Sequence, residues 1–149
     1  MQPITIERTR RIRAPRQHVF DTVVSYRTPG LWQPAAPDRD HVQLKKGDQL
    51  EVTVTVTSDP LQGRARVLAV WPDQYLEIQF HCRAGVTLEQ QWFFADATEG
   101  ASNVTVVTRI DSWDQPPSAA SESVEAIGST LEQILDAIAA LVTRSSATR

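Results

Sequence analysis

The clearest pattern in the chain is an alternation of apolar and polar residues, which predicts β-strands. Over residues 50–57, leucine and valine alternate with glutamate and threonine, and a period of two places the apolar side chains on one face of a sheet. The same alternation predicts further strands over 4–13, 64–71, 76–82, 86–94 and 104–110. Short turn sequences such as Ala84-Gly85 and Glu99-Gly100 separate them. Connections this short favour antiparallel pairing of successive strands.

Two parts of the chain instead show helical spacing. After Pro15, apolar residues between Val19 and Val24 predict a short amphipathic helix, and we expect a second short helix around Trp32. Near the C-terminus, an apolar stripe at alternating spacings of three and four predicts a helix over 121–143, ~34 Å long at 1.5 Å per residue. The stripe consists of Val124, Ile127, Leu131, Ile134, Ile138 and Leu141. The fold class is therefore α+β, and we expect one domain over residues 1–149.

Composition narrows the class of protein. The chain has 149 residues, a formal net charge of −3 and one cysteine. This charge argues against general binding to nucleic acid, which depends on neutralising phosphates, and a single cysteine excludes an internal disulfide scaffold. No continuous apolar run approaches the ~20 residues of a membrane span, and Met1 to Arg13 alternates apolar with charged residues, unlike a signal peptide. We expect a cytoplasmic protein with no integral membrane segment.

Local motifs, taken with the order of the elements, resemble one known superfamily. Ile12-Arg13-Ala14-Pro15 precedes the first helix, Trp32-Gln33-Pro34 follows it, and the segment Val67 to Pro72 leads through a proline-marked hairpin to Leu76. Together they resemble the START-like, helix-grip superfamily of the birch-pollen allergen and the polyketide cyclases, also called SRPBCC. The resemblance implies a curved antiparallel sheet of about seven strands wrapped around a long C-terminal helix, with two short helices after the first strand. It also implies a deep, mostly apolar cavity between the sheet and the long helix.

The resemblance and the strand alternation together name the residues expected to line this cavity. Gln90 and Thr108 are polar at positions whose neighbours on the same face are apolar, so they either satisfy structural partners or orient the polar groups of a ligand. Gly128, inside the long helix, either leaves room for a ligand or allows the close approach of a strand or loop. The expected ligand-binding residues are Tyr26, Trp32, Val54, Phe80, Gln90, Trp92, Phe94, Val106, Thr108, Gly128, Leu131 and Leu135.

Motifs of known catalytic and metal sites do not occur. The sequence has no glycine-rich phosphate loop and no G-x-S-x-G motif, and its three histidines lack metal-ligand spacing. We expect no metal and no cofactor, and no catalytic residue is identified. Cys82 shares its face with Phe80 and is expected to point inward, whereas His81 points outward. Arg8 and Arg10, two of five arginines over residues 8–16, either belong to a solvated edge strand or reach the cavity and favour an acidic or phenolic ligand.

Three functions follow from the resemblance and stay open at this point. The first is binding of a small hydrophobic molecule by a polyketide cyclase- or aromatase-type enzyme. The second is a non-catalytic carrier or sensor of a lipid- or quinone-like ligand. The third is an interaction module similar to the START-like chaperone activators, which predicts an exposed apolar patch. The sequence leaves the identity of the ligand and the oligomeric state open.

Overall fold

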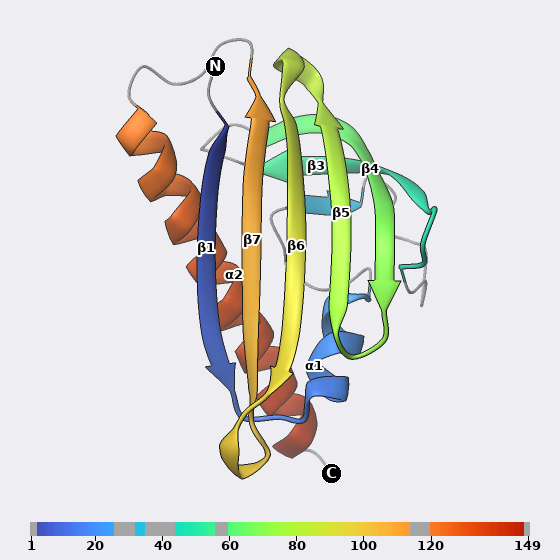
Figure 1. The fold of residues 1–149 in the computed structure, drawn as a ribbon, viewed down its shortest axis with the longest axis vertical. Helices are drawn as coiled ribbons and strands as arrows, with labels where there is room; N and C mark the ends of the chain where they lie inside the picture. Colours follow the sequence, from blue (N-terminus) through green and yellow to red (C-terminus); the bar gives the residue numbers. More distant parts are fainter. Residues whose placement is uncertain (1–2, 26–31, 35–43, 56–59, 114–119, 148–149) are drawn as a thin grey trace.

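The computed structural model describes residues 3–25, 32–34, 44–55, 60–113 and 120–147. Figure 1 shows a single sheet with a long helix behind it. In chain order the elements are β1 (Ile4–Ile12), α1 (Arg16–Val23), β2 (Trp32–Pro34), β3 (Gln49–Thr55), β4 (Pro60–Trp71), β5 (Tyr75–Cys82), β6 (Thr87–Asp96), β7 (Ser102–Ser112) and α2 (Ala120–Ala147).

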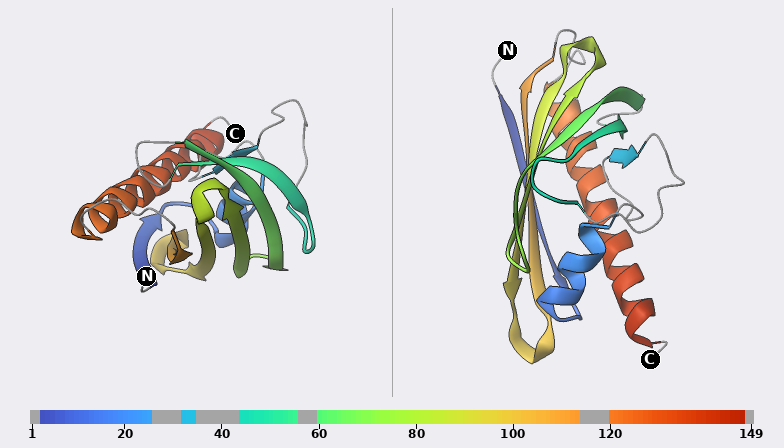
Figure 2. Two further views of the ribbon diagram at one scale, coloured as in Figure 1. Left: turned by 90° about the horizontal axis from the view of Figure 1, so that it is seen from above. Right: turned by 90° about the vertical axis from the view of Figure 1, so that its right-hand side faces the viewer.

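The seven strands form one antiparallel sheet in the order β1-β7-β6-β5-β4-β3-β2. Strands β2 to β7 pair with their neighbours in sequence, and β1 closes the far edge by pairing with β7. The sheet curves around one face, and α2 runs along that face (Figure 2). We call this the inner face and the opposite one the outer face. The predicted curved sheet of about seven strands with a long C-terminal helix is therefore confirmed.

The inner face carries the hydrophobic core. Along β5, β6 and β7 almost fully buried residues alternate with partly buried or exposed ones, and the buried apolar members join one hydrophobic core. Helix α1 contacts α2 as well as β6 and β7, and its Phe20 ring meets the Phe94 ring edge-on with centroids 5.2 Å apart. The short helix thus seals one end of the space between the sheet and α2.

Helix α2 presents a continuous buried stripe to this core. The stripe consists of Ile127, Leu131, Ile134, Leu135, Ile138 and Val142. The predicted stripe is correct in its middle but not at its ends: Val124 is 38% exposed, and Leu141 is only partly buried whereas its neighbour Val142 is fully buried. Residues Val124–Thr143 have a mean hydropathy of 1.3, so by length and composition alone this helix could cross a membrane. In this fold its most apolar side is instead covered by the sheet.

Two local features differ from the sequence-based expectation. Trp32–Pro34 form strand β2, paired with β3, rather than a second short helix; the neighbouring residues 26–31 and 35–43 lie outside the described part. In β4, the pairing with β5 shifts between Val67 and Ala69. This bulge reverses the inward–outward alternation within one strand. For that reason apolar residues occur at both odd and even positions of the β4 sequence.

Candidate functional site

Three polar groups form a buried chain on the inner face of β6 and β7. Trp92 Nε1 donates a hydrogen bond to Gln90 Oε1 over 3.2 Å, and Gln90 Nε2 donates to Thr108 Oγ1 over 3.3 Å. The exposed fractions of Gln90, Trp92 and Thr108 are 0%, 3% and 1%. Gln90 and Thr108 face each other directly across the two strands, so strand pairing itself brings them together. The inward orientation expected from the alternation is the observed one.

The three hydrogen-bonded side chains still have unused hydrogen-bonding capacity. A glutamine amide offers two N–H donors and two acceptor lone pairs, and a threonine hydroxyl can donate as well as accept. The contacts formed by Gln90 use one donor and one acceptor site, while Thr108 is engaged as an acceptor. A polar ligand atom beside these residues could therefore be bound without breaking the existing bonds.

Apolar residues surround the polar chain. Val54, Phe80, Val106, Leu131 and Leu135, all named from the sequence, belong to the same buried core as the aromatic residues of β6. Their exposed fractions are 2% or less. Side chains this inaccessible pack directly against their neighbours, so the inner face is closely packed at these positions.

The two candidates from the segment after α1 are less completely defined. Tyr26 lies outside the described residues. Trp32 lies in β2, directly opposite Val54 of β3 in the pairing register, and its side chain is also outside the described part. The backbone of Trp32 thus reaches the same edge of the sheet as one predicted lining residue.

Gly128 is buried beside a side chain of the edge strand. A Cβ atom built at Gly128 would lie 3.0 Å from Arg8 Cζ and closer still to Nη2. The same guanidinium places Nε 3.3 Å from Glu132 Oε1, one turn further along α2. Of the two alternatives for Gly128, the close approach of a strand therefore describes this structure, since Arg8 occupies the space that a side chain would need.

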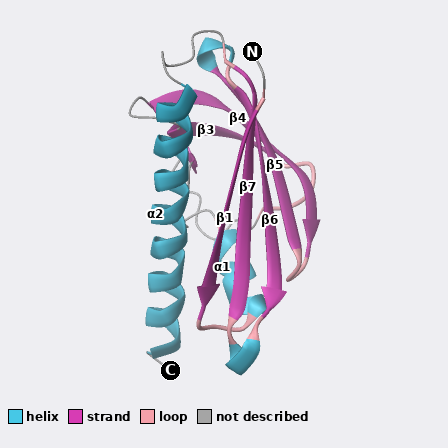
Figure 3. Cartoon of the chain, turned by 60° about the vertical axis from the view of Figure 1, so that its left-hand side comes forward, coloured by secondary structure: helices cyan, strands magenta, loops and turns pink. Residues whose placement is uncertain are grey.

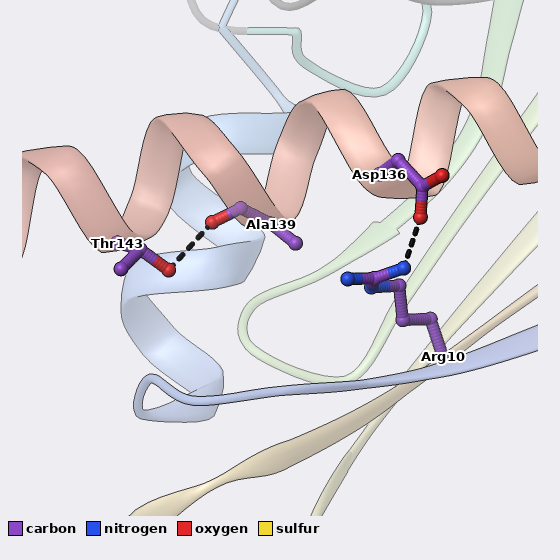
Figure 4. Close-up of polar contacts among 4 residues, drawn as sticks. All are labelled: Arg10, Asp136, Ala139 and Thr143. Carbon is purple, nitrogen blue, oxygen red and sulfur yellow. Dashed lines mark hydrogen bonds and ion pairs between the residues drawn. The ribbon is translucent and has the colours of Figure 1, made fainter.

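Arg10, two residues further along β1, makes a similar contact with α2. Its guanidinium is hydrogen-bonded and ion-paired to Asp136 (Figure 4), and Figure 3 shows α2 running alongside β1. Both inward-parity arginines thus reach carboxylates of the helix. The spacing of these residues is a sequence signal for the contact: Gly128, Glu132 and Asp136 recur every four residues on one helix face, matching Arg8 and Arg10 on one face of β1.

The remaining polar candidates lie elsewhere. Cys82 is half-buried against the core, and burial raises its pKa to about 11, while His81 is exposed as expected. Both border a hollow of about 470 Å³ over β3, β4 and β5. Most of its lining consists of exposed polar side chains, including Arg64 and Arg83. Among the described residues, no group of three histidine, cysteine or acidic side chains is placed to hold a metal ion.

Comparison with known proteins adds evidence at the level of the fold. No family model matches the chain, and no curated protein sequence matches it. Several solved structures, however, are similar to it in fold. Ara h 8.0201 aligns over 95% of this chain and 99% of its own, with a TM-score of 0.67 and 14% identity. Norcoclaurine synthase of Thalictrum flavum, solved with a transition-state analogue, aligns over 97% and 96%, with a TM-score of 0.62 and 12% identity.

A third similar structure is DynU16, described as a putative protein in the dynemicin biosynthetic locus. It aligns over 93% of this chain and 47% of its own, with a TM-score of 0.67 and 17% identity. The chain has the START-like helix-grip fold. At identities this low the structural similarity shows the fold alone, so the chemistry has to be argued from this protein's own residues.

Proposed function

We propose that the protein binds a small, largely apolar molecule between the inner face of the sheet and α2. The observation that carries the proposal is the buried chain of Trp92, Gln90 and Thr108, which keeps unused donors and an acceptor in otherwise apolar surroundings. Small-molecule sites combine mostly apolar walls with a few placed polar groups. A carbonyl or hydroxyl on the ligand would meet the spare groups of Gln90 and Thr108.

Binding at this place requires the core to open. The lining residues pack directly against one another, so a ligand has to separate part of α1 or α2 from the sheet. Helix α2 packs along β1 and is also connected to it by the pairs Arg8–Glu132 and Arg10–Asp136. We propose that α2 stays joined to β1 while the side facing β5 and β6 admits the ligand.

The residues available favour binding over acid–base catalysis. In the described part of the chain, the fully buried polar residues are Gln90, Ser102 and Thr108, and none of these three side chains exchanges a proton readily near neutral pH, as a general acid or base must. One imidazole atom, Nε2 of the partly buried His18 on α1, is also buried, but it is not part of the polar chain of Trp92, Gln90 and Thr108. We therefore propose a carrier or sensor of a lipid- or quinone-like molecule. The alternative is cyclase-type turnover, which can rest largely on holding a flexible substrate in a reactive shape. The experiment below distinguishes turnover from simple binding.

Native mass spectrometry of the purified protein tests binding directly. We expect a co-purified small molecule that is released unchanged on denaturation; release of a converted product after incubation with the free compound would favour turnover instead. Binding of 1-anilinonaphthalene-8-sulfonate, a fluorescent apolar anion, gives a second readout. The Thr108→Val variant should weaken it by removing a polar group from the buried chain of hydrogen bonds.

Thr105→Val provides the matched control, because Thr105 lies on β7 but shares a hydrogen bond with Thr9 on the outer face. The control should bind the probe as the wild-type protein does. The proposal is wrong if no molecule co-purifies and if Thr108→Val and Thr105→Val both leave probe affinity unchanged. Circular dichroism of each variant checks that it is folded.

A further inference from the structure

The outer face of the sheet carries an exposed row of aromatic side chains. Trp71, Tyr75 and Phe93 lie on three adjacent strands, β4, β5 and β6, directly opposite one another in the pairing register. The ring centroids of Trp71 and Tyr75 are 5.1 Å apart, as are those of Tyr75 and Phe93. We call these three residues the aromatic row. Because each ring contacts the next, the row forms a continuous apolar strip.

The exposure of the row is unusual for this protein. Within the described residues, Trp71 is 60% exposed and Phe93 is 42% exposed, and the remaining exposed large apolar residue is Val124 on α2. Side chains of this size are normally buried, and their grouping on a surface is typical of an interaction site. Neither helix covers them, because α1 and α2 lie against the inner face (Figure 2).

Negative charge borders the row. Burial and then the charge of Glu77 raise the pKa of the Tyr75 hydroxyl, and Glu89 adds to the effect. Glu77 lies two residues from Tyr75 on the same face of β5, and Glu89 lies four residues from Phe93 along the same face of β6, opposite Gln79. Glu89 faces Arg109 in the register, but Arg109 Nε is bound 2.7 Å from Asp111 Oδ1. The row thus combines exposed aromatic faces with acidic groups beside them.

We infer that the aromatic row is a docking surface for a basic segment of a partner protein. Cations are attracted to the faces of tryptophan, tyrosine and phenylalanine within about 6 Å of the ring centre, and arginine also stacks its planar guanidinium on them. Glu77 and Glu89 supply charge complementarity for the same arginine and lysine side chains. Such a segment would lie across β4, β5 and β6.

This surface is separate from the proposed ligand site. Strand alternation places Phe93 on the outer face and its neighbours Trp92 and Phe94 in the core. A variant that changes the row therefore leaves the polar chain of Gln90 and Thr108 in place. Failure of either proposal says nothing about the other.

Fluorescence anisotropy with a labelled peptide of alternating arginine and glycine tests the inference on the full chain. We expect saturable binding that weakens with added salt and is absent for a peptide of alternating glutamate and glycine. Trp71→Ser and Phe93→Ser should each weaken binding about fivefold, the size expected for loss of one exposed cation–π contact. Glu77→Gln should weaken it in the same direction.

Two substitutions on α2 serve as matched controls. Val124→Ser removes an exposed apolar side chain and Glu125→Gln an exposed carboxylate, both away from the row; each should bind as wild type. Phe93→Ser keeps the test decisive if Trp71→Ser fails to fold. Equal affinities for the row variants and the controls would overturn the inference. So would equal binding of the acidic peptide, binding of cello-oligosaccharides in place of the arginine peptide, or self-association through the row in analytical ultracentrifugation.

Discussion

Replacing Thr108 by valine isolates one hydrogen bond of the buried polar chain. Valine has nearly the shape of threonine, so the change creates almost no cavity, but it removes the acceptor of Gln90 Nε2. Both residues are almost fully buried, so water cannot replace the lost partner. We expect the variant to be less stable than the wild-type protein.

The magnitude follows from the cost of a buried donor without a partner, about 1–3 kcal/mol. The Gln90–Thr108 bond is long, at 3.3 Å, which places the expected loss in the lower part of that range, at about 1–2 kcal/mol. With a urea dependence of about 2 kcal/mol per molar, the unfolding midpoint should fall by about 0.5–1 M. Far-UV circular dichroism during urea titration measures it.

A double-mutant cycle separates this bond from other effects. Gln90→Leu alone leaves both the Thr108 hydroxyl and Trp92 Nε1 without their partner, whereas the double variant with Thr108→Val leaves only the indole N–H. The double variant should therefore be more stable than the sum of the single changes implies, by about 1–2 kcal/mol. A loss below about 0.3 kcal/mol for Thr108→Val, or simple additivity in the cycle, would refute the reasoning.

Three further predictions concern α2 and the cysteine. Gly128→Ala should stabilise the Arg8→Ala protein by about 1 kcal/mol through helix propensity but stabilise the wild-type protein less, because the new Cβ displaces the Arg8 guanidinium; equal gains in thermal denaturation would contradict this. Asp136→Asn should cost at most about 1 kcal/mol at low salt and nothing at 1 M salt, since its pair with Arg10 is exposed; a salt-independent loss would argue otherwise. With a pKa raised from 9.0 to about 11, the folded Cys82 thiol should react with iodoacetamide at pH 8 roughly 100-fold more slowly than in urea, because the thiolate is the nucleophile. The difference should shrink as the pH approaches 11, and equal rates at pH 8 would show that the thiol is not shielded.

The residues Gln90 and Thr108 show what the alternation of apolar and polar residues can predict and what it cannot. The positions of Gln90 and Thr108 among apolar neighbours predict that both point inward, and they do. Their hydrogen bond depends on the register between β6 and β7. A shift of one residue would turn one strand's side chains to the other face, so local sequence could not establish which partners meet.

The environment of Gly128 was settled by packing between distant segments. A glycine in a helix is compatible with an open cavity or with a close neighbour, and sequence spacing does not separate the two. The distinction depends on where β1 crosses α2, some 120 residues apart in the chain, and there Arg8 fills the space. Contacts of this kind are set by tertiary packing between segments that are far apart in the sequence.

Apart from the segment at Trp32, the sequence by itself determined the element types, their order and the inward face of most strands, because periods of two and of three to four directly record which side of each element is buried. Tertiary structure decided what lies on each surface. Trp71 has the same parity as the buried Val67, so simple alternation would bury it. The bulge between Val67 and Ala69 inserts one extra residue and turns Trp71 outward beside Tyr75. A bulge depends on how β4 must bend to remain paired with β5, and that requirement exists only once the curved sheet has formed.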